Sequence, residues 1–255
     1  MSLTASLRSL LTAASEAAAN AHAPYSGRAA GAALLLSSGE WIPGARVENA
    51  SYPLTIPASV AAYCGARALG RSDFAALATS DDFPAGEAEA LASAMGFSEV
   101  RVSEGVLIGD GEMPSFSSRL DAVFQAPDSE SAGIARAREA ARHAFVPASD
   151  FPVGCVVVDA AGRAVAGCNV EHDDWTRGLC GERVALAIAQ SFGLGPITRA
   201  YLTCIKDPKG TPCGACRQVI AEQMPDAVIV IDRGGSAVEH TDAAQLLPGS
   251  FVFPV

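Results

Sequence analysis

Apolar positions at the beginning of the chain follow a helical spacing and then give way to runs typical of strands. Leu3, Leu7 and Leu10 recur at intervals of three or four residues, which predicts an amphipathic helix over roughly residues 3–21. Two apolar runs separated by a glycine turn come next and predict a pair of strands, which a further helix follows. The same succession of helix, two strands and helix begins again in the second half of the chain.

The second half continues beyond this shared pattern. Its first helix is expected over 130–145, and after the repeated elements we expect a strand over 200–205, a helix over 214–223 and a strand over 227–231. Strands that alternate with helices are typical of layered domains. The pattern therefore predicts an α/β fold.

The two halves are copies of one another. PYSGRAAGAALLL, which begins at Pro24, aligns with PASDFPVGCVVV, which begins at Pro147, and VENASYPLTIPAS aligns with VEHDDWTRGLCGE. The offset is 123 positions at three landmarks: Gly31 and Gly154, Glu48 and Glu171, Pro57 and Cys180. A constant offset indicates an internal duplication. The Pro-, Asp- and Ser-rich segment at 126–131 is the natural boundary, so we expect one domain over 1–126 and a second over 127–255.

The net charge, the apolar runs and the cysteine content indicate which partners and which cellular location to expect. The formal net charge of −10 leaves no basic stripe for a phosphate backbone, which argues against polymeric nucleic acid as a partner. No apolar run is long enough to cross a bilayer, so we expect no membrane association. The seven cysteines lack the pattern of a secreted disulfide scaffold and fit a reducing compartment, which predicts a cytoplasmic protein.

Three cysteines and one glutamate in the second half have the spacing of a metal centre. Cys180, Cys213 and Cys216 lie near predicted helix N-termini, where the helix dipole favours thiolates. Three protein ligands leave a fourth tetrahedral position on zinc for water, and Glu182 lies close enough to reach that water. A CxxC pair alone could equally be a redox pair, but the CxE motif upstream favours an open, catalytic zinc site. The four histidines match no ligand spacing and are treated as ordinary.

Four motifs occur in order along the chain: NVE at 169–171, CGERVA at 180–185, PCGACRQV at 212–219 and LLPGSF at 246–251. Their order and spacing resemble those of cytidine deaminases, the zinc enzymes of pyrimidine salvage. The resemblance implies a three-layer fold in which helices flank a mixed sheet, duplicated within this chain. It also implies one Zn²⁺ per chain, held by the second half.

The chemistry that the resemblance implies is hydrolytic deamination of cytidine or deoxycytidine to uridine or deoxyuridine and ammonia. Zinc-bound hydroxide would attack C4 of the cytosine ring while Glu182 moves the protons. Asn169 and Glu171 resemble the pair that binds the ribose 3′-hydroxyl, and Phe151 resembles the aromatic residue that packs on the substrate. Arg183 resembles the arginine that offsets the negative charge of a three-thiolate site.

The first half cannot repeat this chemistry. It has Pro57 for the first ligand, Ser59 for the glutamate and Arg46 for the ribose asparagine. A weaker match, which requires an insertion in the first half, pairs MPSFSSR at 113–119 with TPCGACR at 211–217 and puts serines where the second half has cysteines. We therefore expect 1–126 to be a degenerate, non-catalytic domain.

The first half nevertheless keeps the loop ENASYP, whereas the second half has EHDDWT there. In the tetrameric enzymes that the chain resembles, this loop reaches a neighbour's substrate pocket. The resemblance implies that Ala50, Tyr52 and Phe251 contribute across a subunit interface, in a homodimer that imitates a tetramer of single domains. HDDWT would then face a non-catalytic pocket and be free to change.

Two other functions fit the sequence. A deaminase of another cytosine-containing nucleoside or related small amine would use the same zinc and Glu182. A zinc-binding protein without turnover would not need Glu182 and should supply a fourth ligand, which the sequence does not show.

Overall fold

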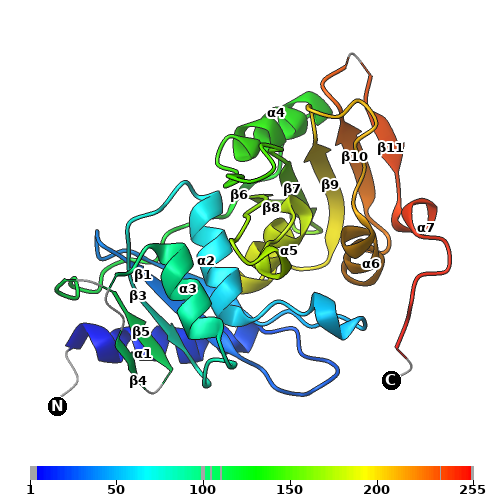
Figure 1. Ribbon diagram of the computed structural model, residues 1–255. Helices are drawn as coiled ribbons and strands as arrows, with labels where there is room; N and C mark the ends of the chain where they lie inside the picture. The colour runs from blue at the N-terminus through cyan, green and yellow to red at the C-terminus, as the bar shows by residue number, and fades with distance from the viewer. Residues whose placement is uncertain (1–4, 99–100, 104, 110, 236, 254–255) are drawn as a thin grey trace.

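The computed structural model describes residues 5–98, 101–103, 105–109, 111–235 and 237–253, which build two sheets and the helices around them (Figure 1). The predicted first helix is confirmed over Ala5–Ala17, with a 3-10 turn at Ala18–Asn20, while Leu3 lies outside the described residues. No described helix has the length and hydropathy needed to span a membrane.

The first half forms a five-stranded sheet with the order β2-β1-β3-β5-β4. All its described pairings are antiparallel. Its elements are α1 (Ala5–Ala17), η1 (Ala18–Asn20), β1 (Gly31–Leu36), β2 (Trp41–Ala45), η2 (Tyr52–Leu54), α2 (Ala58–Ala68), β3 (Phe74–Thr79), α3 (Glu87–Met95), β4 (Arg101–Ser103) and β5 (Val106–Ile108).

The second half forms a six-stranded mixed sheet with the order β11-β10-β9-β7-β8-β6. Strand β10 runs parallel to β9 because a helix, α6, crosses over between them. The elements are β6 (Phe124–Gln125), α4 (Glu130–Ala141), β7 (Gly154–Asp159), β8 (Arg163–Cys168), η3 (Trp175–Arg177), α5 (Gly181–Ser191), β9 (Ile197–Thr203), α6 (Gly214–Gln223), β10 (Val228–Asp232), β11 (Glu239–Thr241) and α7 (Ala243–Leu246).

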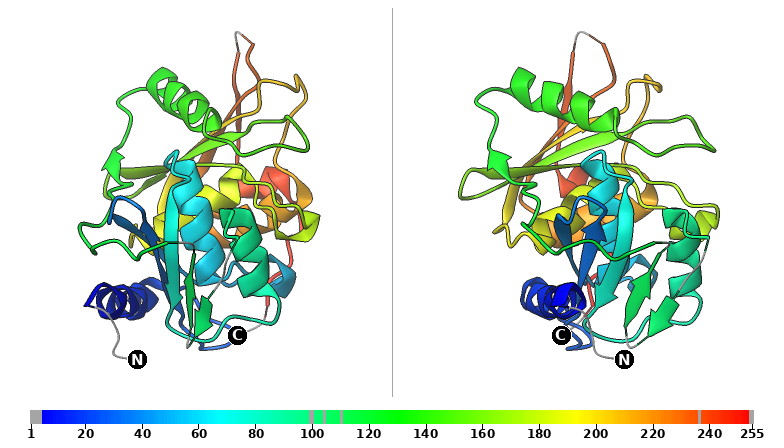
Figure 2. Two further views of the ribbon diagram at one scale, coloured as in Figure 1. Left: turned by 60° about the vertical axis from the view of Figure 1, so that its left-hand side comes forward. Right: turned by 90° about the vertical axis from the view of Figure 1, so that its left-hand side faces the viewer.

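Helices cover both faces of each sheet, which confirms the expected three-layer α/β fold. In the first half, Ala33 and Leu35 of β1 pack on α1, while Leu34 on the opposite face packs toward α2. In the second half, Val156 of β7 packs toward α4 and Val157 toward α5. Because α2 and α5 lie side by side, their apolar residues merge into one core that both halves share (Figures 1 and 2).

Two expectations need correction. The segment 113–119 begins no helix: it lies beside β2, where Trp41 stacks on Phe116, so its serines do not occupy the places of Cys213 and Cys216. The first-half sheet is also not mixed, because β4 and β5 form a hairpin that returns β5 antiparallel to β3.

Gly31 and Gly154 occupy equivalent positions in the two halves, where a strand lies very close to the helix that covers it. A Cβ on Gly31 would overlap the carbonyl of Ala14 in α1, and a Cβ on Gly154 would overlap the carbonyl of Ala137 in α4. Each strand therefore approaches the backbone of its covering helix more closely than any side chain allows.

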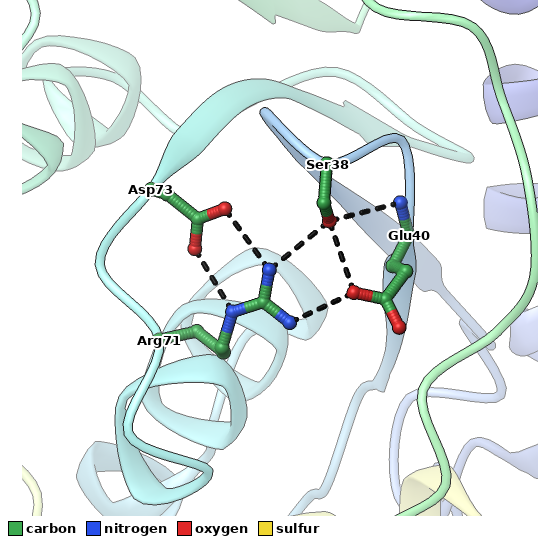
Figure 3. A network of polar contacts seen from close by, with 4 residues as sticks. All are labelled: Ser38, Glu40, Arg71 and Asp73. Carbon is green, nitrogen blue, oxygen red and sulfur yellow. Dashed lines mark hydrogen bonds and ion pairs between the residues drawn. The ribbon is translucent and has the colours of Figure 1, made fainter.

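A network of exposed and half-buried polar groups fixes the β1–β2 turn (Figure 3). Arg71 donates to both carboxylate oxygens of Asp73, at 2.9 and 3.0 Å, and to Glu40 and Ser38 at 3.0 Å. These hydrogen bonds from Arg71 hold the pKa values of Asp73 and Glu40 below their usual range. The network joins the first strand pair to the beginning of β3.

Replacing Gly154 by Ala should destabilise the protein by about 1–3 kcal/mol or more, because the new methyl group must displace the α4 backbone. Gly235→Ala is the matched control, since no atom lies within 4 Å of a Cβ at that position, and it should change stability by less than about 0.5 kcal/mol. Denaturant unfolding monitored by circular dichroism measures both, and equal stability of the two variants would contradict the close approach.

Candidate functional site

Three thiols from two helix N-termini come together in the second half. Cys180 is the N-cap of α5, Cys213 is the N-cap of α6, and Cys216 lies in the first turn of α6. Their sulfur atoms all lie within 4.8 Å of one another, and the Sγ atoms of Cys180 and Cys213 are 3.6 Å apart. The structure thus assembles the predicted cysteine cluster.

This cluster has dimensions that suit a tetrahedral metal. Zn–S bonds of about 2.3 Å place two sulfur ligands roughly 3.8 Å apart, close to the separation of Cys180 and Cys213. No other His, Cys, Asp or Glu of the described ranges joins the group. Three sulfur donors fit zinc and leave one coordination position open.

The thiols also need a cation. Hydrogen bonds from the thiols of Cys180 and Cys216 and from the amides of Cys216 and Ala215 lower the pKa of Cys213 to about 2. Its thiolate in turn raises the pKa of Cys180 to about 12, because the Cys180 thiol donates to it. One thiolate therefore forms readily, whereas three thiolates at this spacing repel one another unless a metal ion neutralises them.

Glu182 stands beside the cluster in the first turn of α5. Its side chain is only 5% exposed. Burial is the main cause that raises the pKa of Glu182 to about 7, and the nearby Cys213 adds to the rise, while Arg183 opposes it. A carboxyl group with this pKa can both accept and release a proton near neutral pH.

A cavity of about 590 Å³ opens onto the cluster. Six of the residues expected in the site line it: Phe151, Asn169, Glu171, Cys180, Glu182 and Cys213. Cys216 is fully buried behind it. A volume of this size suits a small organic molecule.

Asn169 and Glu171 hold the cavity's backbone in place. Asn169 accepts from the amide of Val153 at 2.8 Å and donates to the carbonyl of Phe151 at 2.9 Å. Glu171 accepts from the amides of Ala148 and Ser149 at 2.8 and 3.2 Å. Burial acts to raise the pKa of Glu171, but hydrogen bonds from Ser149 and these amides outweigh burial and lower it.

The same carboxylate arrangement occurs in the first half. Glu48 accepts from the amides of Tyr25 and Ser26 at 3.1 and 3.0 Å, and from Arg46 at 3.0 Å. These are the positions that match Glu171 and its loop in the repeat. Glu48 therefore has a structural role in a half without the metal ligands.

Arg183 faces the first half. Its Nη2 atom donates to the carbonyl of Leu54 at 3.0 Å, and its Nε atom is buried without a hydrogen-bond partner among the described residues. Its positive charge lowers the pKa of Glu182. The arginine thus links the ENASYP loop to the helix that carries Glu182.

The residues expected to act across an interface lie outside the cavity of their own chain. Glu222 of α6 accepts from the amide of Ala50 at 2.8 Å, so the loop is anchored on the second half. Tyr52 on this loop is 85% exposed, and Phe251 is 53% exposed and packs edge-on against Phe253. Both aromatic rings are free to meet another molecule.

The HDDWT loop lies between two cavities. His172 lines the small cavity of the first half, beside Glu87 and against α3. His172 and Trp175 also line the larger cavity that contains Cys180 and Glu182, which the sequence did not predict. The sequence missed these residues because the loop departs from the motif; its position directly after Glu171 was the available signal.

The first half has filled the space of the lost site. Ser59, which stands where the second half has Glu182, donates to the buried carboxylate of Glu87 at the beginning of α3. Burial raises the pKa of Glu87. The cavity beside this pair measures about 10 Å³, less than a nucleoside needs.

Models of known protein families match both halves of the chain. The description "Cytidine and deoxycytidylate deaminase zinc-binding region" belongs to two family models, which match residues 127–232 and 2–79. This description and the three-thiol cluster together support zinc as the metal.

Individual relatives agree with the models. The cytidine deaminase of Sporosarcina psychrophila is 40% identical over 124 residues, which cover 46% of this chain and 88% of that protein. The cytidine deaminase of Mycobacterium tuberculosis strain H37Rv is 37% identical over 118 residues, covering 45% of this chain and 84% of that protein. The crystal structure of the Burkholderia pseudomallei enzyme gives a TM-score of 0.46 at 34% identity, covering 48% of this chain and 99% of that one. The chain belongs to the cytidine deaminase family.

Proposed function

We propose that this protein deaminates cytidine or deoxycytidine by hydrolysis, which yields uridine or deoxyuridine and ammonia and serves pyrimidine salvage. The observation that carries the proposal is the placement of Glu182, which is buried and has a raised pKa, in one cavity with the thiols of Cys180 and Cys213. Family membership identifies the substrate class, since the relatives are named cytidine deaminases.

We assign the zinc to Cys180, Cys213 and Cys216, and when bound it supplies an acidified water molecule and a Lewis acid. Glu182 accepts the proton that leaves the attacking water and transfers it to N3 of the ring. It then assists the departure of the amine as ammonia, so that one water is consumed and the exocyclic nitrogen is lost. The burial that raises the pKa of Glu182 prepares it for both directions of transfer.

The ribose and base have separate partners in the cavity. The backbone contacts of Asn169 leave it one amide hydrogen. The carboxylate of Glu171 accepts from two amides and from the Ser149 side chain, and its two oxygens have enough lone pairs to accept from the sugar 3′-hydroxyl as well. Phe151 is half-buried in the wall and offers a face for packing. Arg183, whose positive charge already lowers the pKa of Glu182, is proposed to offset the negative charge of the three thiolates.

Each chain is proposed to hold one zinc ion, in its second domain. Pro57 and Ser59 supply no ligand to the first half, and Glu87 occupies the space beside them. We keep the proposed domains at 1–126 and 127–255, although β6 pairs with β8 and so extends the second sheet slightly before this boundary. The cytoplasmic location stays a prediction that the seven free thiols support.

We further propose a homodimer in which Ala50, Tyr52 and Phe251 complete the cavity of the partner chain. The support is the exposure of both rings, the hydrogen bonds from Ala50 to Glu222 that anchor the loop of Tyr52, and those between Phe251 and Gln218 that hold the tail. The two first domains would then occupy the places of two subunits in a tetramer of single domains.

Glu182→Gln should lower the turnover of cytidine by about 10²- to 10⁴-fold, because the amide cannot transfer the proton. Loss of cytidine absorbance measures turnover, with deoxycytidine and other cytosine nucleosides tested in parallel. The variant should keep its zinc, which separates loss of chemistry from loss of the metal. Undiminished turnover would contradict the assignment of Glu182, and no turnover of any cytosine nucleoside by the unaltered, zinc-loaded protein would contradict the proposed function.

Metal analysis of the purified protein should find about one zinc per chain, and Cys216→Ser should lose most of it because one of three thiolates is removed. Cys64→Ser is the matched control, since Cys64 is a buried thiol in α2 of the first half. Two zinc ions per chain, or full zinc in Cys216→Ser, would contradict the single centre.

Tyr52→Ala should raise KM for cytidine by about tenfold with zinc content unchanged, because the ring would be lost from the partner's cavity. Steady-state kinetics and sedimentation together test this expectation. Full activity of the variant, or full activity of a protein shown to be monomeric, would contradict the shared cavity.

A further inference from the structure

Trp175 has an unusual place in the wall of the zinc cavity. It lines the cavity, yet 68% of its surface is exposed. A residue that lines the cavity and yet stays mostly exposed lies at its rim, and His172, close to it in the sequence, lines the same cavity. A ring held in that position loses its contact with water when a flat, partly apolar molecule enters.

Hydrogen bonds fix the turn that carries the ring. Trp175 begins η3, and Asp174 caps it by accepting from the amide and hydroxyl of Thr176 at 3.1 and 2.7 Å and from Nε of Arg177 at 3.0 Å. Both carboxylate oxygens are engaged. These local hydrogen bonds favour the observed conformation of the turn.

His172 attaches this turn to the other half of the chain. The amide of Asp174 donates to its Nδ1 atom at 2.9 Å, so Nε2 carries the hydrogen and donates to the carbonyl of Ala90 in α3 at 3.1 Å. The rim of the catalytic cavity is thus built on a helix of the degenerate half. This contact gives that half a role within its own chain, independent of any second copy.

We propose that Trp175 packs on the bound nucleoside and determines specificity at the rim, and that His172 is the positioning residue that seats it on α3. The inference rests on the proposed function, because a nucleoside is the ligand that it requires. Stacking of a base on an aromatic side chain corresponds to a change of about 5- to 100-fold in affinity, and a rim position falls toward the lower end.

Fluorescence of Trp175 tests the contact directly. The chain has two tryptophans, and Trp41 stacks on Phe116 outside the cavity, so Trp41→Phe leaves Trp175 as the single reporter. Titrating the zinc-loaded variant with uridine should give a saturable change in emission with the dissociation constant that calorimetry measures.

Substitution of the ring should separate binding from chemistry. In kinetic assays, Trp175→Ala should raise KM for cytidine by about 5- to 20-fold with kcat within about twofold, and Trp175→Phe should recover most of the loss. A loss confined to kcat would overturn the role in substrate packing.

The positioning role has a matched control. His172→Leu keeps the size of the side chain but removes both hydrogen bonds, and in the Trp41→Phe background it should weaken the uridine response and raise KM. His143→Leu removes a similar contact between the halves, the 2.9 Å hydrogen bond to the carbonyl of Ala68, at a place that does not line the cavity. It should leave the uridine response and KM unchanged.

The outcomes separate the proposals. Calorimetric binding of uridine without a change in Trp175 emission overturns the packing role and leaves the proposed function standing. Equal effects of His172→Leu and His143→Leu overturn the positioning role. Absence of uridine binding by calorimetry contradicts the proposed function and the inference together.

Discussion

The packing of α2 against α5 is the contact on which the rest of the structure depends. Ile188 of α5 lies against Gly65 of α2, and apolar side chains from both sheets merge around them into one core. Because Cys180 caps α5 and Glu182 lies in its first turn, the first half of the chain helps to set the position of the helix that carries both residues. A buried apolar interface of this kind explains why the chain keeps both copies.

The sequence predicts the cluster of three cysteines well, because Cys180 and Cys213 lie at helix starts that local sequence patterns indicate. Cys180 and Cys213 cap helices whose beginnings follow from apolar spacing, and the helix expected over 214–223 is observed over those residues. The loop after Glu171 could not be predicted in this way. His172 takes its position from the carbonyl of Ala90, a partner 82 residues away, and no local pattern records such a contact.

Partial repetition also limits what sequence comparison can show. Alignment matched Ser115 and Ser118 to metal ligands, but the backbone places them beside β2, because the two halves diverge after β3 and β9. Glu48 is retained in the first half for a structural reason. Its match to Glu171 suggests a ligand-binding role, but the hydrogen bonds that Glu48 accepts from the amides of Tyr25 and Ser26 explain why a carboxylate stands at that position.

The hydrogen bond between Ser59 and Glu87 fills the place that a restored glutamate would need. A reversal of Pro57 to cysteine and Ser59 to glutamate would restore two of the four essential groups, yet the new carboxylate would meet the one that Glu87 already places there. The two other cysteines of the second half lie at the beginning of a helix, α6. The described part of the first half has no such helix start near Ser59, because α3 begins with Glu87 and the segment 113–119 lies beside β2. Restoring a metal site in the first half would therefore require changes to the backbone as well as to several side chains.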